Sequence, residues 1–191
     1  MSDTRSQLKQ IAIEQIRRRT LHAASFRELG KVAGIKSSSV HYHFENRDAL
    51  LLELVKDYEQ DFFIRLEQRC HELSDPGQQL QQLAALFQLS QQSQYQCLCL
   101  AFAAAGDETN DQQRAAVEQF LQRLETWISA VLARAADHAD SAPQLARVIL
   151  SALEGALLLD RDQPQAPRLN AVSQWLTTLI RSHSDQQPET L

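Results

Sequence analysis

The sequence of 191 residues has little of what marks secreted, membrane or β-rich proteins. Cysteine occurs only three times, and this low, odd number argues against a disulfide framework and fits a reducing cytoplasm. Glycine and proline occur five times each, and we find no strand-like alternation of useful length. No apolar run approaches the ~20 residues that span a bilayer, and the N-terminus does not resemble a signal peptide. The sequence therefore predicts an all-α, cytoplasmic protein.

Catalytic and metal-binding patterns are missing as well. We find no Ser/His/Asp grouping, no Gly-rich phosphate loop and no His-Glu-x-x-His motif. His41 and His43 suggest a metal pair, but residues two apart on a helix point about 200° apart and cannot share one ion. The sequence predicts neither an enzyme nor a bound metal or cofactor.

Charge is distributed unevenly along the chain, whose formal net charge is −5. Residues 1 to 48 hold nine Lys/Arg and five Asp/Glu, a balance of +4, and the other residues hold ten basic and nineteen acidic groups, a balance of −9. A basic segment can neutralise phosphates, whereas DNA would repel the acidic remainder. We therefore expect the N-terminal segment to meet a nucleic acid.

Residues 25 to 50 have the pattern of a helix, a tight turn and a second, short helix. Ser25 followed by Glu28 is a capping box, which starts a helix. Gly34 can adopt the positive φ that ends it, and Ile35 is suited to anchor the turn. The buried face of this first helix is predicted to consist of Phe26, Leu29, Val32 and Ala33.

The second helix is predicted to hold polar groups outward between two apolar anchors. Ser37, Ser38 and Ser39 offer N-cap oxygens, and Val40 and Phe44 are the anchors. The Ser, His and Tyr side chains between them suit a helix that lies in a DNA groove, although an ordinary helical hairpin with a solvated face is the alternative.

Further helices follow from apolar spacing and capping signals. Before the hairpin, Leu8, Ile11, Ala12 and Ile16 form one stripe, and the basic run 17–19 behind it suits either DNA or the helix dipole. After the hairpin, predicted helices cover about 47–73, 95–105, 111–138, 143–159 and 167–181, and another helix begins at Pro76 and includes Leu80, Leu83, Ala84 and Phe87.

The last two predicted helices carry more apolar surface than one core face requires. Leu150, Leu158 and Leu159 lie off the main stripe of residues 143–159. The surplus predicts self-association through 143–159 and 167–181. A better-buried helix is the alternative.

Residues 8 to 55 resemble the TetR family of bacterial transcriptional regulators. The resemblance rests on several motif pieces at matching offsets: Ser25-Phe26-Arg27-Glu28-Leu29, Ala33-Gly34-Ile35, Ser38-Ser39-Val40-His41-Tyr42-His43-Phe44 and Arg47-Asp48-Ala49-Leu50. The stretch 153–159 is similar to the dimerisation helix of many members.

The resemblance implies an N-terminal three-helix helix-turn-helix head (1–48), a helical effector-binding and dimerisation domain (49–183) and a tail (184–191). It implies a homodimeric repressor that a small molecule releases from a pseudo-palindromic operator. The predicted DNA contacts are Ser25, Arg27, Lys36, Ser37, Ser38, Ser39, His41, Tyr42, His43 and Arg47.

The sequence departs from the family pattern at three positions. His41 stands where members usually have the first Tyr of an aromatic run, and Thr20 occupies the usual Gly before the second helix. Gly30 replaces the usual Ala, a change that costs up to ~1 kcal/mol of helix propensity but permits closer packing.

The predicted effector pocket is mostly apolar and is lined by Phe87, Tyr95, Cys97, Phe102 and Trp127. Cys97 and Cys99 are read either as small core residues or, for Cys97, as a thiol that senses an electrophile, as in a subset of the resembling family. Any activating cation would come from another helix, with Arg123 and His138 as donors.

Three functions compete at this stage. The first is the ligand-responsive repressor dimer, and the second is a DNA-bound interaction protein of the same fold without a small-molecule ligand. The third is an enzyme with an incidental helical hairpin. A second domain filled with large side chains, without a cavity, would favour the interaction protein. A lack of specific DNA binding would favour the enzyme.

Overall fold

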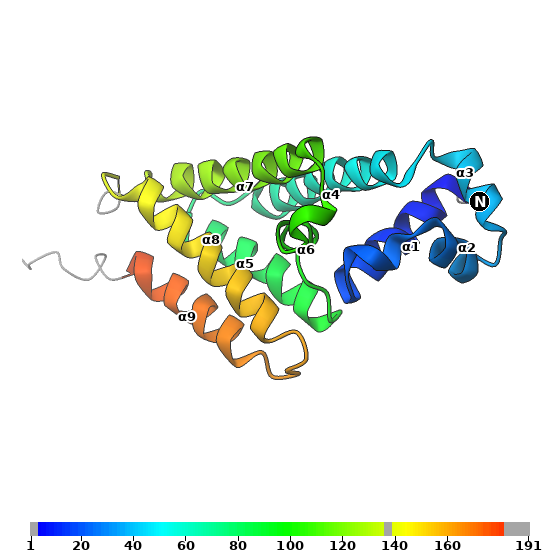
Figure 1. Cartoon of the computed structure of the whole chain (residues 1–191). Coiled ribbons are helices and arrows are strands. Elements are labelled where there is room, and N and C mark those ends of the chain that lie inside the picture. The colour runs from blue at the N-terminus through cyan, green and yellow to red at the C-terminus, as the bar shows by residue number, and fades with distance from the viewer. Residues whose placement is uncertain (1–3, 136–138, 182–191) are drawn as a thin grey trace, which may run out of the picture. The chain divides into compact units, whose positions relative to one another are not determined.

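The structure is a computed structural model that describes residues 4–135 and 139–181, all of them helical or connecting, without a strand. The predicted tail 184–191 and His138 lie outside these residues. The helical elements are α1 (Thr4–Arg18), η1 (Leu21–Ala24), α2 (Phe26–Ala33), α3 (Ser37–His43), α4 (Arg47–Cys70), α5 (Pro76–Gln92), α6 (Leu98–Ala103), η2 (Gly106–Glu108), α7 (Asp111–Leu132), α8 (Ala142–Leu159) and α9 (Pro167–Arg181) (Figure 1).

The described chain forms two compact units, and each is considered by itself. The first unit runs to residue 62 and includes 95–121, and the second consists of 63–94 and the residues from 122 onward. Helices α4 and α7 therefore contribute to both units. The predicted functional boundary between residues 48 and 49 stays a prediction.

In the first unit, α1 and α2 follow the predicted local rules closely. Leu8, Ala12 and Ile16 are fully buried on α1. Ser25 caps α2 by accepting a hydrogen bond from the Glu28 N–H at 3.3 Å. Gly34 ends α2 with a φ of +70°. The expectation of a buried Val32 is wrong, because its side chain is 51% exposed on the outer face of α2.

The short helix α3 begins at Ser37 itself, whereas a serine cap would place the first helical residue after that serine. Lys36 is its N-cap residue and no side chain caps it, so the predicted N-cap role of Ser37–Ser39 is wrong. The two apolar anchors are confirmed: Val40 is fully buried and Phe44 is 4% exposed.

Gly30 has a steric reason for its place in α2. A Cβ at this position would lie 2.9 Å from the Ile35 carbonyl oxygen and 3.2 Å from the Ser37 N–H nitrogen. Real Cβ atoms do not approach backbone so closely, so the alanine usual in the family would push α2 away from the turn and from α3. The predicted close packing at this glycine is confirmed.

Helix α6 is shorter than predicted, since it covers Leu98–Ala103 rather than 95–105. Gln94 takes a left-handed conformation with φ of +56°, and the Gln96 N–H donates to the Arg17 carbonyl at 3.1 Å. The segment before α6 is therefore tied to α1 and cannot continue the helix. A tertiary contact overrides local helix propensity here.

In the second unit, α5 packs against α8 and α9, and α8 packs against α9 (Figure 1). Asp75 caps α5 by accepting from the Gln78 N–H at 2.7 Å, and α4 ends at Cys70 rather than near residue 73 as predicted. By length and composition α8 is able to cross a membrane, but 44% of it is buried within the fold, and such a single helix is weak evidence for a membrane span.

Candidate nucleic-acid interface and ligand groove

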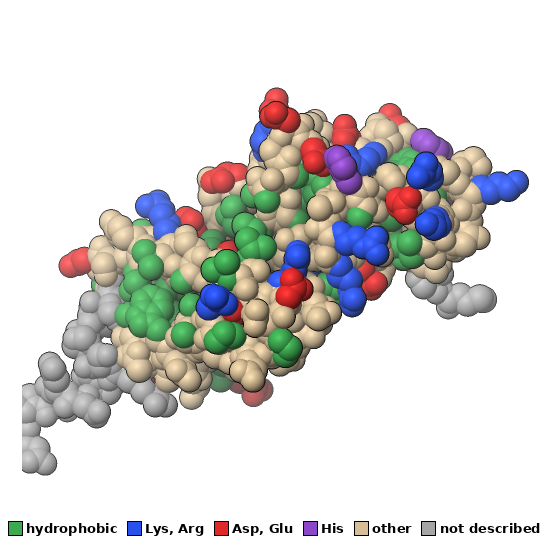
Figure 2. All heavy atoms as spheres, turned by 60° about the horizontal axis from the view of Figure 1, so that its bottom comes forward, with side chains coloured by type: hydrophobic (Ala, Val, Ile, Leu, Met, Phe, Trp, Pro, Cys, Tyr) green, Lys and Arg blue, Asp and Glu red, His purple; other side chains and the backbone are tan. Residues whose placement is uncertain are grey.

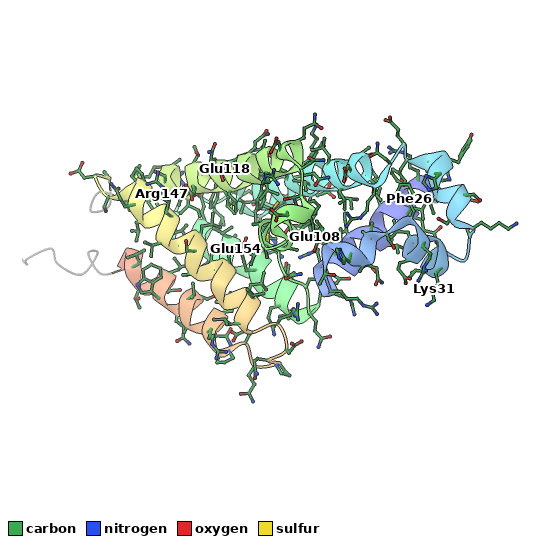
Figure 3. All side chains as sticks on the ribbon, viewed as in Figure 1. Phe26, Lys31, Glu108, Glu118, Arg147 and Glu154 are labelled. Carbon is green, nitrogen blue, oxygen red and sulfur yellow. The ribbon has the colours of Figure 1, made fainter. Side chains whose placement is uncertain are left out.

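The helix-turn-helix is held together by aromatic rings between α2 and α3. Phe26 is labelled on α2 in Figure 3. Its ring packs edge-on against His41 at 4.7 Å between ring centroids and lies 6.4 Å from the Phe44 ring. Val40 fills the space beneath α3. These contacts fix the face of α3 that points outward.

That outward face presents the predicted reading residues. Tyr42 is 87% exposed, the largest exposed fraction among the big apolar side chains of the described chain. His43 is half-buried, and its ring lies edge-on to Tyr42 at 5.3 Å. Side chains that project from a rigid short helix are placed as direct base readout requires.

The other predicted contacts surround this face with polar and basic groups. The Arg27 side chain is 89% exposed, with one ion pair to Glu28 at 3.7 Å. Lys36, Ser38 and Ser39 are exposed, while Ser37 is half-buried. Ser25 is half-buried, and its hydroxyl is occupied as a cap.

Arg47 and His41 already have intramolecular roles. One Nη of Arg47 donates to the Leu21 carbonyl at 2.7 Å and so ties the start of α4 to η1. His41 remains exposed but packs on Phe26. A phosphate contact by Arg47 would use its other N–H groups.

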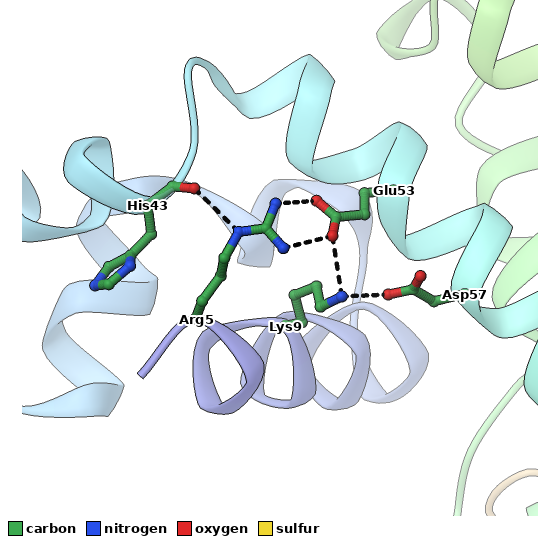
Figure 4. A network of polar contacts seen from close by, with 5 residues as sticks. All are labelled: Arg5, Lys9, His43, Glu53 and Asp57. Atoms are coloured by element: carbon green, nitrogen blue, oxygen red, sulfur yellow. Dashed lines mark hydrogen bonds and ion pairs between the residues drawn. The ribbon is translucent and has the colours of Figure 1, made fainter. Parts of the chain in front are cut away.

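A network of charged groups joins α1, α3 and α4 (Figure 4). Arg5 forms a bidentate pair with Glu53, with N–O distances of 2.7 and 2.6 Å, and its Nε donates to the His43 carbonyl at 3.3 Å. Lys9 donates to Glu53 at 3.0 Å and to Asp57 at 2.6 Å. Sequence reasoning missed this network, because its acids lie beyond residue 48.

The pKa values of two members of this network, Glu53 and Lys9, shift toward the charged forms. The Arg5 guanidinium, aided by Lys9, lowers the pKa of Glu53 against the opposing effect of burial. Burial lowers the pKa of Lys9, but its bonds to Asp57 and Glu53 outweigh burial and raise it. Both shifts favour the charged forms of Glu53 and Lys9.

Arg17, which belongs to the basic run of α1, is buried rather than available to DNA. Its Nε donates to the Gln96 carbonyl at 2.9 Å, and its guanidinium lies over the Tyr95 ring at 4.7 Å and the Tyr58 ring at 5.4 Å. The Gln96 side chain in turn donates to the Ile16 carbonyl at 3.2 Å. The end of α1 is thus locked to the segment before α6.

A groove of about 600 Å³ lies within the second unit, between the later parts of α4 and α7. Its walls include Phe63, Leu66, Cys70, His71, Arg123 and Trp127. The Arg123 guanidinium stacks on the Phe63 ring at 3.9 Å. Apolar walls with a few charged groups, at this volume, are typical of small-molecule sites.

The five predicted pocket residues have different surroundings in the structure. Trp127 lines the groove, Phe87 is buried in α5, and Phe102 lines a smaller cavity of about 230 Å³ in the first unit. Tyr95 carries Arg17 and Arg18 on its ring. Cys97 is 3% exposed and accepts a hydrogen bond from the Tyr58 hydroxyl at 3.7 Å.

All three cysteines are free and buried. Cys70, which lines the groove and was not singled out by sequence, has a pKa raised by burial, with Arg134 and Arg69 opposing the rise. Within residues 4–135 and 139–181, no cluster of His, Cys, Asp and Glu is arranged to hold a metal ion.

Two family models match the chain. The model described as "Bacterial regulatory proteins, tetR family" covers residues 10–54, and "Transcriptional regulator LmrA/YxaF-like, C-terminal domain" covers residues 77–174. The chain belongs to the TetR family of bacterial regulatory proteins. Its members are DNA-binding regulators of transcription and not enzymes.

Relatives agree with this assignment. The HTH-type transcriptional repressor KstR2 of Mycolicibacterium smegmatis is 30% identical over 86 residues, which span 45% of this chain and 40% of that protein. A TetR transcriptional regulator from Legionella pneumophila has a similar fold, with a TM-score of 0.87, 23% identity and coverage of 94% of this chain and 98% of that one. A TetR-family transcriptional regulator from Agrobacterium tumefaciens also has a similar fold, with a TM-score of 0.82, 22% identity and coverage of 92% of this chain and 96% of that one.

Proposed function

We propose that the protein is a ligand-responsive transcriptional repressor that binds a pseudo-palindromic operator as a homodimer. The observation that carries the proposal is the outward face of α3, where Tyr42 is 87% exposed above two buried anchors. Exposure of an aromatic ring to water is unfavourable, and contact with base edges in a DNA major groove would remove this ring from water. The KstR2 relative is itself a repressor.

The proposed contacts divide into two kinds. Tyr42 and His43 of α3 are suited to base edges, while Arg27, Lys36 and Arg47 surround them and are suited to phosphates. Ser25, Ser37, Ser38, Ser39 and His41 complete the proposed DNA-contacting set.

The experiment is selection of duplexes from a random-sequence pool by the parent chain, followed by titration of the enriched duplex and of a scrambled duplex. We expect an enriched sequence with two related half-sites one helical turn or a multiple apart. No enrichment at low salt would contradict DNA recognition. Arg27→Ala should weaken both duplexes alike and reduce the salt slope.

For the effector we propose the groove lined by Phe63, Trp127 and Arg123. Its apolar walls suit a flat or branched hydrophobic body, and the groove favours the ligand-responsive reading over the interaction protein, which needs no such space. A compound library screened for thermal stabilisation of the parent chain tests this. Trp127→Ala should abolish the shift, whereas Leu89→Ala, which truncates an exposed apolar side chain of α5 outside the groove, is the control and should keep it.

A covalent, electrophilic effector is a second form of the same proposal. Cys97 is shielded in the described conformation, while Cys70 lines the groove. The test is release of the enriched duplex after treatment with a mild electrophile, compared among the parent, Cys97→Ser, Cys99→Ser and Cys70→Ser. Loss of release in a single variant identifies the sensing thiol, and equal release in all four chains excludes thiol chemistry.

The homodimer is proposed to form through α8 and α9. Val148 is 54% exposed, Leu159 63% and Trp175 37%, and apolar side chains gather over these helices in Figure 2. An apolar surface of this kind marks an association site. Sedimentation should show a dimer at micromolar concentration, and Leu159→Glu should give a monomer that still folds. The cytoplasm is the proposed compartment, because none of the three cysteines forms a disulfide.

A further inference from the structure

Arg5 is placed at the end of the recognition helix rather than on its reading face. His43 is the last residue of α3, and its carbonyl is one of those that an α-helix leaves without an internal partner. The Nε of Arg5 donates to that carbonyl, and the guanidinium lies 4.8 Å from the centre of the Phe44 ring. A cation at a helix C-terminus also suits the helix dipole.

The other side of Arg5 is held by α4. Both Nη atoms are committed to the two carboxylate oxygens of Glu53, a planar fork that fixes the orientation of the guanidinium (Figure 4). Lys9 then binds the same carboxylate and Asp57, so that Glu53 itself is held from two sides. Three helices therefore meet at one guanidinium.

We propose that Arg5 and Glu53 are positioning residues for sequence readout: they fix the C-terminal end of α3, and with it Tyr42 and His43, relative to α4. The inference rests on the proposed DNA binding and adds that two of the nine basic residues before position 48, Arg5 and Lys9, serve the fold of the head instead of phosphates. Base readout depends on atom positions, whereas attraction to phosphates acts over several ångströms.

The two roles predict opposite signs for Glu53→Gln. Removing a carboxylate from the basic head makes its potential more positive, so a purely electrostatic effect tightens binding to every duplex. If Glu53 positions α3, the same substitution weakens binding to the enriched duplex and leaves the scrambled one unchanged or tighter. We expect the affinity ratio of enriched to scrambled duplex to fall about tenfold, comparable to the loss of one charge-assisted hydrogen bond.

Two further variants isolate geometry from charge. Arg5→Lys keeps the charge but cannot span Glu53 and the His43 carbonyl together, and we expect it to reduce the affinity ratio as Glu53→Gln does. Glu14→Gln is the matched control, because it removes one carboxylate from α1 that accepts a hydrogen bond from the Gln10 side chain one turn earlier and takes no part in the Arg5 network. It should leave the ratio unchanged.

The salt dependence supplies an independent reading. Arg5→Met should leave the slope of log affinity against log salt unchanged, whereas Arg27→Met should reduce it by roughly 0.9. Thermal unfolding of every variant is recorded alongside. The inference is overturned if Glu53→Gln tightens both duplexes equally, or if it weakens both equally in step with lost thermal stability. Absence of any enriched duplex for the parent chain would instead contradict the proposed function.

Discussion

The two compact units differ in the side-chain contacts that stabilise each of them internally. In the first unit, charged and amide side chains join elements far apart in the sequence, such as Arg5 with Glu53 and Arg17 with Gln96. In the second, apolar faces of α5, α8 and α9 pack on one another, and the polar contacts between distant elements come mainly from amide side chains, such as Gln91, which donates to the Asp160 and Gln163 carbonyls. Directional contacts fix an orientation, whereas apolar packing fixes mainly volume.

This difference fits the proposed division of labour. A helix that reads bases must hold its side chains at set positions. The Arg5 network constrains α3 in this way, and the contacts of Arg17 with Gln96 constrain the end of α1. A unit that accepts effectors benefits from walls that tolerate small changes in volume, and the groove is lined mainly by ring and aliphatic side chains.

The largest effect is expected at Asp160, whose side chain is fully buried in the second unit. Its carboxylate accepts from the N–H groups of Arg168 and Leu169, each at 2.8 Å, and pairs with the Arg168 side chain at 2.8 Å. Asp160→Asn should lower the free energy of unfolding by about 2–3 kcal/mol, because hydrogen bonds to a buried charge are lost. Urea unfolding at neutral pH measures this.

Asp162→Asn provides the control for that substitution. The Asp162 side chain is 80% exposed and its distance to Arg161 is 3.9 Å, so its removal should change stability by less than about 0.5 kcal/mol. Equal losses in the two variants would mean that Asp160 does not organise the start of α9.

The pH dependence of Asp160 gives a second measure of the same contact. Burial raises its pKa, but the N–H groups of Leu169 and Arg168 and the Arg168 guanidinium outweigh burial and hold the pKa below the ordinary 3.8. A carboxyl group with a depressed folded-state pKa stabilises fully above its unfolded pKa and loses this effect as the pH falls through the folded value. The stability difference between the parent and Asp160→Asn should therefore stay constant down to about pH 5 and shrink below 3.8. A difference that shrinks already near neutral pH would contradict this.

A smaller effect is expected for the hydrogen bonds of the Gln96 side chain in the first unit. Gln96→Leu keeps the approximate volume but removes the bond to the Ile16 carbonyl, and it should cost about 1–2 kcal/mol of unfolding free energy. Gln92→Leu, exposed at the end of α5, is the control and should be near neutral. If Gln96→Leu were equally neutral, apolar packing would suffice to hold the first unit together.

Local rules account for what the sequence predicted well. The Ser25 cap, the Gly34 turn, the anchors Val40 and Phe44, and the tight packing at Gly30 each depend on neighbours within a few residues. For the same reason the helix-turn-helix and the family were recognisable, since all of their motif pieces lie within residues 8 to 55.

Contacts between distant residues account for what the sequence did not predict. Summing charge over residues 1 to 48 counted Arg5 and Lys9 as available, although their partners Glu53 and Asp57 lie on α4. The length of α6 was overestimated because Gln96 binds α1. Aromatic spacing alone did not separate a residue that lines the groove, Trp127, from one that is simply buried, Phe87.

The smallest effect on stability is expected at Tyr42, on the exposed face of α3 in the first unit. Because 87% of this residue is exposed, Tyr42→Ala should change the free energy of unfolding by less than about 0.5 kcal/mol. Binding to the enriched duplex should nevertheless fall about tenfold, with a change in preference among half-site sequences. Val40→Ala, two positions earlier and fully buried, should lose both stability and binding. If Tyr42→Ala lost stability as Val40→Ala does, its ring would belong to the fold of the head; if binding were unchanged, the reading face of α3 would lie elsewhere.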